Sequence, residues 1–486
     1  MKLPQEFVDR MNIEIKSHEV PSEGFWESFD SYPRKGLRLN RSKVAFAERE
    51  KILELLNVES NNVSWCDGGY YLSENDDVAG KDPFYHAGVY YPQEPSAMLP
   101  AQVMAAKKGD YVLDLCAAPG GKACRLAEDL DGEGLLVANE INETRAKALL
   151  RNIERMGITN CVIVNETPEN LASRFDCFFD KILVDAPCSG EGMFRRDPFA
   201  VKSWEKFGPE VCIKMQEEIL DSAHKMLKVG GELVYSTCTF CYGEDEGQIL
   251  NFLSKYPGYE VISHPEITGV THASNNSKLP GSMRIWPHVS DGDGHFCVHL
   301  RKTLDTRTND DVVIDYSFVS RKRNDNYSYT MSRQAMLDFA KDIFTANAFD
   351  AFSNLVKEQF VFHKNKIHLL GVSEKTFDKL KVVKMGNFPG EIKETTKGRV
   401  FIPSHCFALT LKEDDIDSKS KLVLHRDDDR LARYLRGETI SVDSSEKSML
   451  KKKGYIVIVC EQFPIGFGKI APDGNIKNLY PRAWVN

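Results

Sequence analysis

Short apolar runs alternate with longer amphipathic stretches through the middle of the chain, between residues 111 and 300. The runs are typical of strands buried on both faces of a parallel sheet, and the stretches between them have the spacing of helices. This alternation predicts a doubly wound α/β domain of about 200 residues. The predicted strands are 111–116, 134–139, 161–165, 181–185, 232–236 and 296–300, and the predicted helices are 123–130, 142–156, 209–228 and 244–254.

The helix predicted over 209–228 has proline in its first turn and Gly230-Gly231 beyond its last, which are ordinary start and stop signals. Apolar side chains recur along it at helical spacing, so we expect one stripe of the helix to face the core. That stripe is Val211, Met215, Ile219, Ala223 and Met226.

Residues 1–95 lack this alternation and predict a separate N-terminal domain. A run over 36–43 predicts a strand with Arg38 and Asn40 on one face, and taken alone it is an ordinary solvated strand. Basic residues interleaved with aromatic ones suit a surface that stacks on unpaired bases, so we expect RNA binding here, with many of the rings in the core. The cations are Arg34, Lys35, Arg38, Arg41 and Lys43, and the rings are Trp65, Tyr70, Tyr71, Phe84, Tyr85, Tyr90 and Tyr91.

The alternation also stops after residue 302. A polar and charged stretch over 303–330 predicts a linker, and the last hundred residues contain short strand-like runs at 455–460 and 463–469 with an Asp473-Gly474 hairpin signal. We therefore divide the chain into four predicted parts. They are an RNA-binding domain over 1–95, the catalytic domain over 96–302, a linker and intermediate domain over 303–385, and a β-rich RNA-binding domain over 386–486.

Overall composition narrows the class of protein. A chain of 486 residues with 42% hydrophobic residues is long enough for several globular domains. No apolar run approaches the roughly 20 residues that span a bilayer, and the first residues lack an apolar signal core, so we expect a cytoplasmic protein without a membrane partner. The 12 cysteines are scattered, as expected of thiols in a reducing compartment. A net charge of −8 argues only weakly against nucleic acid, because local patches decide binding.

The first glycine-rich turn, 114–122, follows the first predicted strand of the central domain. It has neither the full dinucleotide pattern nor the second half of a phosphate-binding loop. Pro119, Gly120 and Gly121 leave a small floor of backbone, and Glu140 ends the next strand, where a carboxylate suits the hydroxyls of a ribose. The pattern therefore favours a nucleoside cofactor without a pyrophosphate, S-adenosylmethionine over NAD.

Two cysteines follow neighbouring predicted strands. The run 181–185 ends in Asp185 and leads to Cys188, and the run 232–236 leads to Cys238. Ligands of open α/β sheets bind beyond the carboxyl ends of the strands, so both thiols are expected at one crevice. A single such cysteine is more often inert packing, but two of them at a nucleoside-binding crevice favour nucleophilic chemistry. Cys238 and Cys241 also form a CxxC pair, yet no further ligands have suitable spacing, so we expect no metal.

These motifs resemble those of the Nop/Sun family of RNA cytosine-C5 methyltransferases, over roughly residues 30–302. The resemblance implies a class I, Rossmann-like, S-adenosylmethionine-dependent methyltransferase core. Residues 455–484 are similar to the end of the RsmF/YebU branch, whose members act on small-subunit ribosomal RNA and end in a PUA-like domain. The matching motifs are Cys116–Lys122, Asp185–Gly192 and Ser236–Thr239, with Gln93–Ser96, Arg284–His288 and Gly294–Phe296 around them.

The resemblance also implies a role for each site residue. Cys238 corresponds to the nucleophile, Cys188 to the helper that assists product release, Asp185 to the contact with the cytosine, and Lys122 to a residue lining the same site. The family usually has Asp after the third strand, whereas this chain has Glu166 as the nearest acid. The implied cofactor contacts are Cys116, Ala117, Ala118, Pro119, Gly120, Gly121, Lys122, Glu140, Arg145, Glu166 and Asp185.

Several functions stay open. The favoured one is methylation of RNA, with 16S ribosomal RNA or the small ribosomal subunit as partner and the protein as a monomer. A transfer RNA substrate is an alternative. A DNA cytosine-C5 methyltransferase would use the Pro-Cys thiol, Cys188, as nucleophile, but the second thiol and the basic flanking parts argue against it. A non-catalytic RNA-binding ribosome assembly factor would be expected to lack Cys238 or the glycine-rich turn, and both are present.

Overall fold

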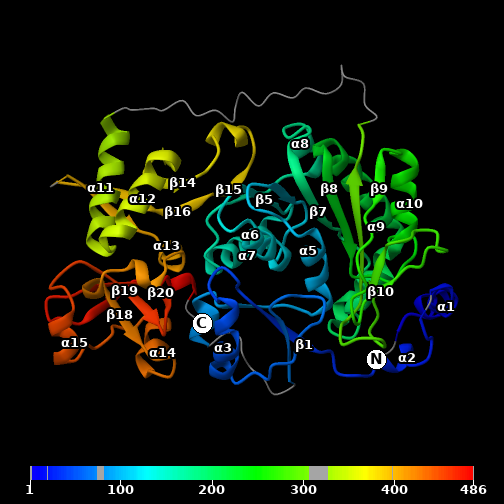
Figure 1. The fold of residues 1–486 in the computed structure, drawn as a ribbon, viewed down its shortest axis with the longest axis horizontal. Helices are drawn as coiled ribbons and strands as arrows, with labels where there is room; N and C mark the ends of the chain where they lie inside the picture. Colours follow the sequence, from blue (N-terminus) through cyan, green and yellow to red (C-terminus); the bar gives the residue numbers. More distant parts are fainter. Residues whose placement is uncertain (1–2, 19, 74–81, 306–326, 397, 485–486) are drawn as a thin grey trace.

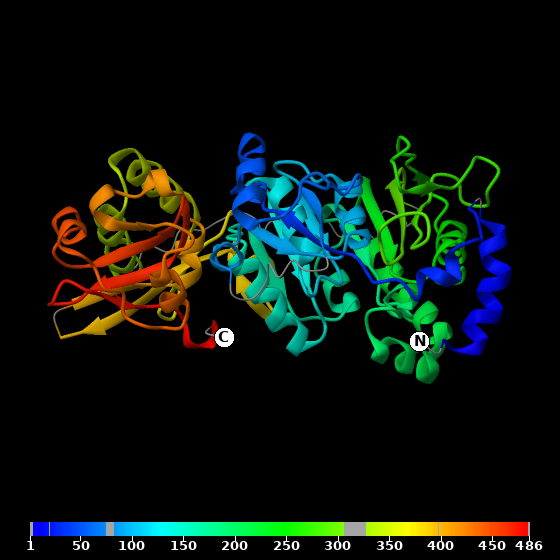
Figure 2. The same cartoon turned by 90° about the horizontal axis from the view of Figure 1, so that it is seen from below.

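The computed structural model describes residues 3–18, 20–73, 82–305, 327–396 and 398–484. The central α/β domain lies between a C-terminal body at one end and helices α1 (Gln5–Glu14) and α2 (Phe25–Ser28) at the other (Figure 2). Within the described ranges, no helix has the length and the apolar content needed to cross a membrane.

The central sheet confirms the predicted doubly wound class. Its strands lie in the order β10-β11-β12-β8-β7-β4-β5-β6-β15, with β9 on β12. Figure 1 labels β5, β7, β8, β9, β10 and β15 of this sheet. Five consecutive neighbours, β8 to β6 in this order, are parallel. The bounds are β4 (Tyr111–Asp114), β5 (Leu135–Asn139), β6 (Cys161–Val164), β7 (Phe179–Asp185), β8 (Leu227–Thr237), β9 (Tyr259–Val261), β10 (Thr271–His272), β11 (Met283–Ile285), β12 (His295–Lys302) and β15 (Val382–Met385).

Helices cover both faces of this sheet, which explains the uniformly apolar strands. Along β4, Val112 packs into the core on one face and Leu113 into the core on the other. Period-two alternation of side chains therefore buries every position instead of every second one. The covering helices are α5 (Leu99–Met104), α6 (Gly121–Leu130), α7 (Glu143–Arg155), α8 (Pro168–Ala172), α9 (Pro198–Met226) and α10 (Glu246–Lys255).

Helix α9 departs from its predicted form. It is broken at Gly208, whose φ is 64° and ψ is 174°, so its second part begins at Pro209 as predicted. The helix ends at Met226, before the glycine pair, which lies within β8. The predicted buried stripe is wrong at Val211 and Met215, which are 49% and 42% exposed. The side chain of Gln216 donates to Pro187 O, which lies beyond the end of β7. The helical turns that precede Gln216, with Val211 and Met215, therefore extend past the end of the sheet and are not covered by it.

The N-terminal domain uses its cations differently from the prediction. Its antiparallel sheet consists of β1 (Lys35–Leu39), β2 (Gly69–Leu72) and β3 (Tyr90–Pro92). Arg38 is fully buried and its Nη1 lies 2.6 Å from Glu128 Oε1 of α6, and Lys43 donates to Ala87 O. The prediction of an RNA-facing side chain is therefore wrong at Arg38, which joins the domain to the catalytic core, whereas Lys43 is half-buried.

The aromatic residues of this domain mostly form its core. Five of the seven rings are at most 5% exposed, which confirms the prediction that many of them are core residues; Tyr71 and Tyr85 are half-buried. Arg34, Lys35 and Arg41 keep surface exposure, although Arg41 is paired with Asp67 and Asp129. The five buried rings are Trp65, Tyr70, Phe84, Tyr90 and Tyr91.

The C-terminal body has two four-stranded sheets with helices α11 (Tyr327–Ile343) and α12 (Ala346–Gln359). One sheet contains strands from both sides of residue 385, so the intermediate and C-terminal parts pack together. The predicted strands at 455–460 and 463–469 and the Asp473-Gly474 turn are confirmed; most of the predicted linker, 306–326, lies outside the described residues. The strands are β13 (Phe360–His363), β14 (Lys366–Leu369), β16 (Asn387–Thr395) and β17 (Gly398–Pro403), then β18 (Lys421–Leu424), β19 (Tyr455–Cys460), β20 (Phe463–Ile470) and β21 (Ile476–Asn478).

Candidate active site

Two thiols meet at the carboxyl ends of β7 and β8. Cys188 follows β7, Cys238 follows β8, and their Sγ atoms lie 3.4 Å apart. The strands are parallel neighbours, with Asp185 opposite Ser236, so the two loops leave the sheet at the same level. The contact with Cys238 and burial raise the pKa of the Cys188 thiol well above its ordinary value. Cys188 therefore keeps its proton at neutral pH and can donate it toward the sulfur of Cys238.

Asp185 is held next to this pair by three neighbours. Lys122 Nζ donates to its Oδ2 at 2.7 Å, and Ser236 Oγ donates to its Oδ1 at 2.9 Å. The buried His295 places Nε2 at 3.6 Å from the same Oδ1. Burial alone would raise the pKa of the Asp185 carboxyl, but the charge of Lys122 and the contact with His295 hold that pKa well below its ordinary value. Asp185 is thus a charged acceptor, while burial lowers the pKa of His295 and keeps its ring neutral.

Lys122 carries its positive charge into the thiol site. Burial would lower the pKa of its amine, but Asp185 and the nearby Cys238 thiol outweigh burial and raise that pKa. An ammonium in this position stabilises a negative charge on a neighbouring sulfur. Lys122 comes from the first turn of α6, directly after the glycine-rich turn, so one short segment serves both the thiols and the first loop.

A buried carboxylate, Glu244, fixes the loop that carries Cys188. Ser189 donates to it through its backbone N at 2.9 Å and its Oγ at 2.5 Å, and Ser189 Oγ lies 2.8 Å from Thr239 Oγ1. Gln216 Nε2 donates both to Glu244 and to Pro187 O, each at 3.0 Å. The residues beside both thiols are therefore tied to one carboxylate. Burial raises its pKa to about 7.

One glycine of the Asp185–Gly192 motif, Gly192, has a role that the sequence did not predict. Gly192 packs on the backbone of Cys238 and donates to its carbonyl at 2.9 Å, so it brings the two loops together instead of facing a substrate. A side chain at Gly192 would come within 3.0 Å of that carbonyl. Gly190 has a φ of 71° in open surroundings and remains free to approach a ligand.

The other half of the sheet edge holds the predicted cofactor residues. The turn 116–120 links β4 to α6, and Gly120 has a φ of 116°, which only glycine adopts readily. Arg145 Nη2 donates to Ala118 O at 2.9 Å, and its Nη1 lies 3.3 Å from Glu140 Oε2. The backbone N of Asn142 donates to Glu140 Oε1 at 2.8 Å. The structure thus brings the glycine-rich turn, Arg145 and Glu140 together, as the sequence predicted.

Asp114 is a further acid of this half that sequence reasoning did not select. It ends β4 between the two halves, is fully buried, and neither of its carboxylate oxygens accepts a hydrogen bond from the described residues. Burial, together with the charge of Asp185, raises its pKa to about 8. A buried carboxyl group without a partner is costly unless a ligand satisfies it. Its position at the end of the first strand of the domain was the signal that could have found it.

Glu166 lies after β6, but its carboxylate is engaged elsewhere. Oε1 accepts from the backbone N of Lys381 at 2.6 Å, and Oε2 accepts from Asn170 Nδ2 at 3.1 Å. Lys381 comes directly before β15, the strand that the C-terminal body adds to the catalytic sheet. Glu166 therefore joins that strand to the core and lines a hollow of about 610 Å³ beside it.

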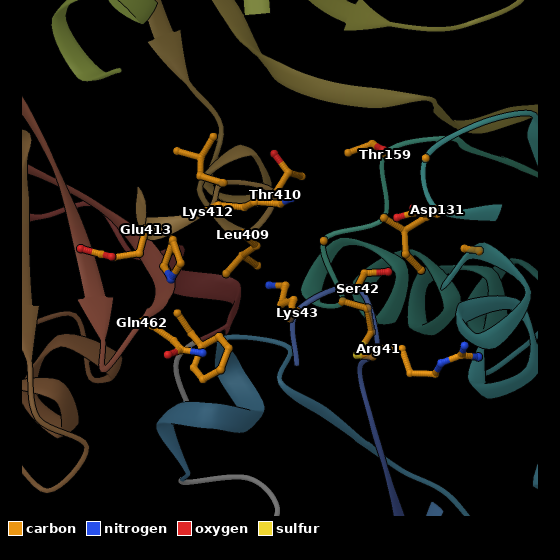
Figure 3. Close-up of a pocket in the computed structure, with 18 of the residues that line it drawn as sticks. Arg41, Ser42, Lys43, Asp131, Thr159, Leu409, Thr410, Lys412, Glu413 and Gln462 are labelled. Atoms are coloured by element: carbon orange, nitrogen blue, oxygen red, sulfur yellow. The ribbon is translucent and has the colours of Figure 1, made fainter. Parts of the chain in front are cut away.

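A pocket of about 630 Å³ lies away from all these residues, where the three parts of the chain meet. Figure 3 shows Arg41, Ser42 and Lys43 on one side of it and Leu409, Lys412 and Glu413 on the other. Gln462 Nε2 donates to Glu48 Oε1 across this junction at 2.9 Å. Neither Cys188 nor Cys238 lines this pocket, whose lining comes from all three parts of the molecule.

Taken with the sheet order, the two halves of this edge define the class of methyltransferases that use a nucleoside methyl donor. Comparison with known proteins identifies the branch. The chain belongs to the family described as 16S rRNA methyltransferase RsmB/F, whose profile matches residues 101–301. The profile of the N-terminal domain of 16S rRNA methyltransferase RsmF matches residues 3–95, and that of the methyltransferase RsmF PUA domain matches residues 421–486. The family implies a methyl donor of the S-adenosylmethionine type.

Curated relatives agree with these domain matches. A ribosomal RNA small subunit methyltransferase F of Shewanella amazonensis is 32% identical over 331 residues, which cover 67% of this chain and 70% of that protein. The protein of the same name from Shewanella piezotolerans is 32% identical over 61% of this chain and 64% of its own length. The one from Vibrio cholerae is 35% identical over 63% of this chain and 66% of its own length. The chain thus spans about two thirds of the curated relatives that it matches.

Solved structures share the fold. A methyltransferase homologue from Pyrococcus horikoshii is 27% identical with a TM-score of 0.51, covering 57% of this chain and 89% of that one. The structure of NSun6 from the same organism has a TM-score of 0.52 at 21% identity, over 63% of this chain and 99% of that one. The predicted fold class is therefore also the fold of experimentally determined structures.

Proposed function

We propose that this protein transfers a methyl group from S-adenosylmethionine to C5 of a cytosine in small-subunit ribosomal RNA, through a covalent adduct at C6. The observation that carries the proposal is the pair of thiols, 3.4 Å apart, beside the charged pair Lys122–Asp185. C5 of cytosine is a poor nucleophile, so an enzyme must first add electrons to the ring. A thiol next to an ammonium can supply them.

Cys238 is the proposed nucleophile and Cys188 the helper. The sulfur of Cys238, as a thiolate, would add to C6 and move the C5–C6 π electrons to C5. C5 would then take the methyl carbon while the bond between that carbon and the donor's sulfonium breaks, and the electron pair of that bond would stay on the donor sulfur. The proton on C5 then leaves to a base, its electrons reform the C5–C6 double bond, and the C6–sulfur bond breaks. Cys188 supports this assignment because its raised pKa keeps it protonated, so it can return a proton to the departing sulfur.

Asp185 is proposed to orient the base. Because its carboxyl is ionised in the free enzyme, it accepts hydrogen bonds and does not donate them. Its contact with cytosine would therefore be to the N4 amino group, or to N3 once N3 carries a proton. Lys122 Nζ, which donates to Asp185 Oδ2 at 2.7 Å, would supply positive charge beside the base as the ring is attacked.

The cofactor half is suited to S-adenosylmethionine. When bound, this group supplies an electrophilic methyl on a sulfonium. The partnerless carboxyl of Asp114 suits the ammonium end of the methionine part, and Glu140 suits the ribose hydroxyls. The turn 116–121 offers backbone to the methionine part, and Arg145 holds that turn against Glu140.

Small-subunit ribosomal RNA is proposed as substrate because the curated relatives carry that name and because the RsmB/F profile and both RsmF domain profiles match. Transfer RNA remains the second candidate. The discriminating experiment incubates the purified full-length protein with labelled S-adenosylmethionine and either unmodified 16S ribosomal RNA, isolated small subunits or bulk transfer RNA.

The proposal expects label in 16S ribosomal RNA or small subunits, recovered as 5-methylcytosine after nuclease digestion. Bisulfite sequencing then gives the position. If 5-methylcytosine is recovered only from transfer RNA, the proposed substrate is wrong and the proposed C5 methylation stands. Label on a ribose or an exocyclic amine would overturn the chemistry as well.

A further inference from the structure

Helix α9 presents an unusual apolar surface to solvent. Its exposed large hydrophobic residues are Phe199, Phe207, Val211 and Met215, with Phe199 at 74% and Phe207 at 52% exposure. Val211 and Met215 are four residues apart in the second part of the helix and share a face. Single exposed apolar residues are normal, and Phe199 and Phe207 stand out because they are aromatic and lie on the same part of the helix, before the break at Gly208.

Each exposed ring has a lysine above it. Lys202 Nζ lies 5.4 Å from the ring centroid of Phe199, and Lys206 Nζ lies 4.8 Å from that of Phe207. A ring with an adjacent ammonium offers one face for stacking and a charge for a phosphate. The same segment also has acidic residues, Glu205 and Glu210, so the rings and not net charge distinguish this surface.

The surface adjoins the thiol site. Gln216, next to Met215, donates to Pro187 O directly before Cys188. Ile213 packs on Gly243, in the turn that follows Cys238 and precedes the Glu244 clamp. These contacts join the second part of α9 to the loops that hold both thiols. In the first part, which carries Phe199 and Phe207, Trp204 Nε1 donates to Glu191 Oε1 of the Asp185–Gly192 motif at 2.8 Å.

We propose that Phe199 and Phe207, with Lys202 and Lys206, form a stacking surface for unpaired nucleotides that flank the target cytosine. Cytosine must leave its stack before a sulfur can reach C6, and the bases beside it then lose a stacking neighbour. Aromatic side chains with adjacent cations replace that neighbour at little cost in sequence preference. This inference rests on the proposed function for its substrate, RNA, and adds where the RNA lies.

The test measures binding of a 12-nucleotide unpaired RNA containing cytosines, and of the same RNA paired to its complement, to the full-length protein. The double variant Phe199→Ala/Phe207→Ala should bind the unpaired RNA roughly tenfold or more weakly and the duplex unchanged. Phe199→Tyr/Phe207→Tyr should keep the affinity. Phe46→Ala is the matched control, because Phe46 is 81% exposed with Arg49 at 4.9 Å but lies near the domain junction.

Calorimetric binding of S-adenosylmethionine by every variant shows that the catalytic domain is folded. Ultraviolet cross-linking of the unpaired RNA should label peptides that contain Phe199 or Phe207. Equal affinity of the alanine variant and the wild type would overturn the inference. So would an unchanged RNA affinity with a loss of self-association in sedimentation, which would assign the surface to a second copy of the chain. Because binding and not turnover is measured, absent methylation would overturn the proposed function alone.

Discussion

The two halves of the carboxyl edge of the central sheet are built on different principles. On the cofactor half, beyond β4 and β5, carboxylates are fixed by backbone and arginine contacts, or are left without a partner as in Asp114. On the half proposed to bind the cytosine base (the base half), beyond β7 and β8, polar groups surround the sulfurs of Cys188 and Cys238 and keep the carboxyl of Asp185 ionised. Under the proposed function, the first half offers hydrogen bonds to the cofactor, and the second controls charge and protons.

This difference implies that substitutions in the two halves should affect different quantities, cofactor affinity in one half and turnover in the other. Changes beyond β4 and β5 should alter cofactor affinity, and changes beyond β7 and β8 should alter turnover at saturating cofactor. Lys122 is the exception, since it follows the cofactor loop but binds Asp185. A variant of the base half that loses cofactor binding would break the comparison.

The largest effect is expected for Cys238→Ala. Without the sulfur no electrons reach C5, so methyl transfer should be undetectable, while the affinity for S-adenosylmethionine should change by less than about twofold. Incorporation of labelled methyl and calorimetry measure the two quantities. Cys212→Ala is the control, because Cys212 is another half-buried thiol nearby whose loss should leave turnover intact.

A smaller effect, confined to binding, is expected for Glu140→Ala. Loss of charge-assisted hydrogen bonds to two hydroxyls should weaken S-adenosylmethionine binding by roughly 10- to 100-fold, with turnover at saturation changed much less. Titration calorimetry and the dependence of rate on cofactor concentration measure this. Glu143→Ala, an exposed acid in the first turn of the following helix, should have no such effect. A fall in turnover without weaker S-adenosylmethionine binding would contradict the assignment of Glu140 to the cofactor half.

Glu244→Gln should change the pH dependence of the free energy of unfolding more than it changes the rate of methyl transfer. The Glu244 carboxyl has an ordinary pKa of 4.5 and a folded-state pKa of about 7 because of burial. Between these values the unfolded chain has lost the proton that the folded protein keeps, so this group's contribution to stability falls as pH rises and is lost above pH 7. The change is up to about 3 kcal/mol. The glutamine variant should lack this fall in chemical unfolding measured from pH 4.5 to 8.

Gln at 244 can keep the contacts to Ser189 N and Gln216 while its amide donates to Ser189 Oγ, so turnover should stay within about tenfold. Glu244→Ala removes the clamp and should lower turnover further. Identical pH profiles of stability in the wild type and the glutamine variant would show that this carboxyl does not carry a raised pKa.

The smallest effect is expected for Glu166→Gln. Its two oxygens accept from Lys381 N and Asn170, so they are engaged with the protein and not with a ligand. S-adenosylmethionine affinity should change by less than about threefold. A loss comparable with that of Glu140→Ala would restore Glu166 as the acid that contacts the adenine, and would extend the cofactor half to β6.

Much of the core could be predicted because each strand is buried on both faces and reads as an apolar run. Asp185, Cys188 and Cys238 could be placed together because parallel strands end at one edge. Glu244 and Gln216 could not, since they bind each other and loop atoms that are far away in the sequence, namely Pro187 O, Ser189 N and Ser189 Oγ. Period and spacing give no signal for such contacts.

The N-terminal domain shows the opposite failure. Its cations and rings suggest a nucleic-acid surface, but Arg38 pairs with a buried acid of α6 that is 90 residues away in the sequence. The sequence shows charge and cannot show whether that charge has a partner inside. Helix α9 shows the same limit for apolar side chains. The spacing of Val211 and Met215 predicts that they are buried, but these residues lie where the sheet has already ended.

The division of labour between the thiols is the central claim, and trapping the covalent adduct tests it most directly. Full-length Cys188→Ala and Cys238→Ala are each incubated with 16S ribosomal RNA and S-adenosylmethionine and run on a denaturing gel. The account predicts a protein–RNA species that survives denaturation with Cys188→Ala, because the adduct forms but cannot break, and none with Cys238→Ala. A trapped species with Cys238→Ala and none with Cys188→Ala would contradict it and make Cys188 the nucleophile.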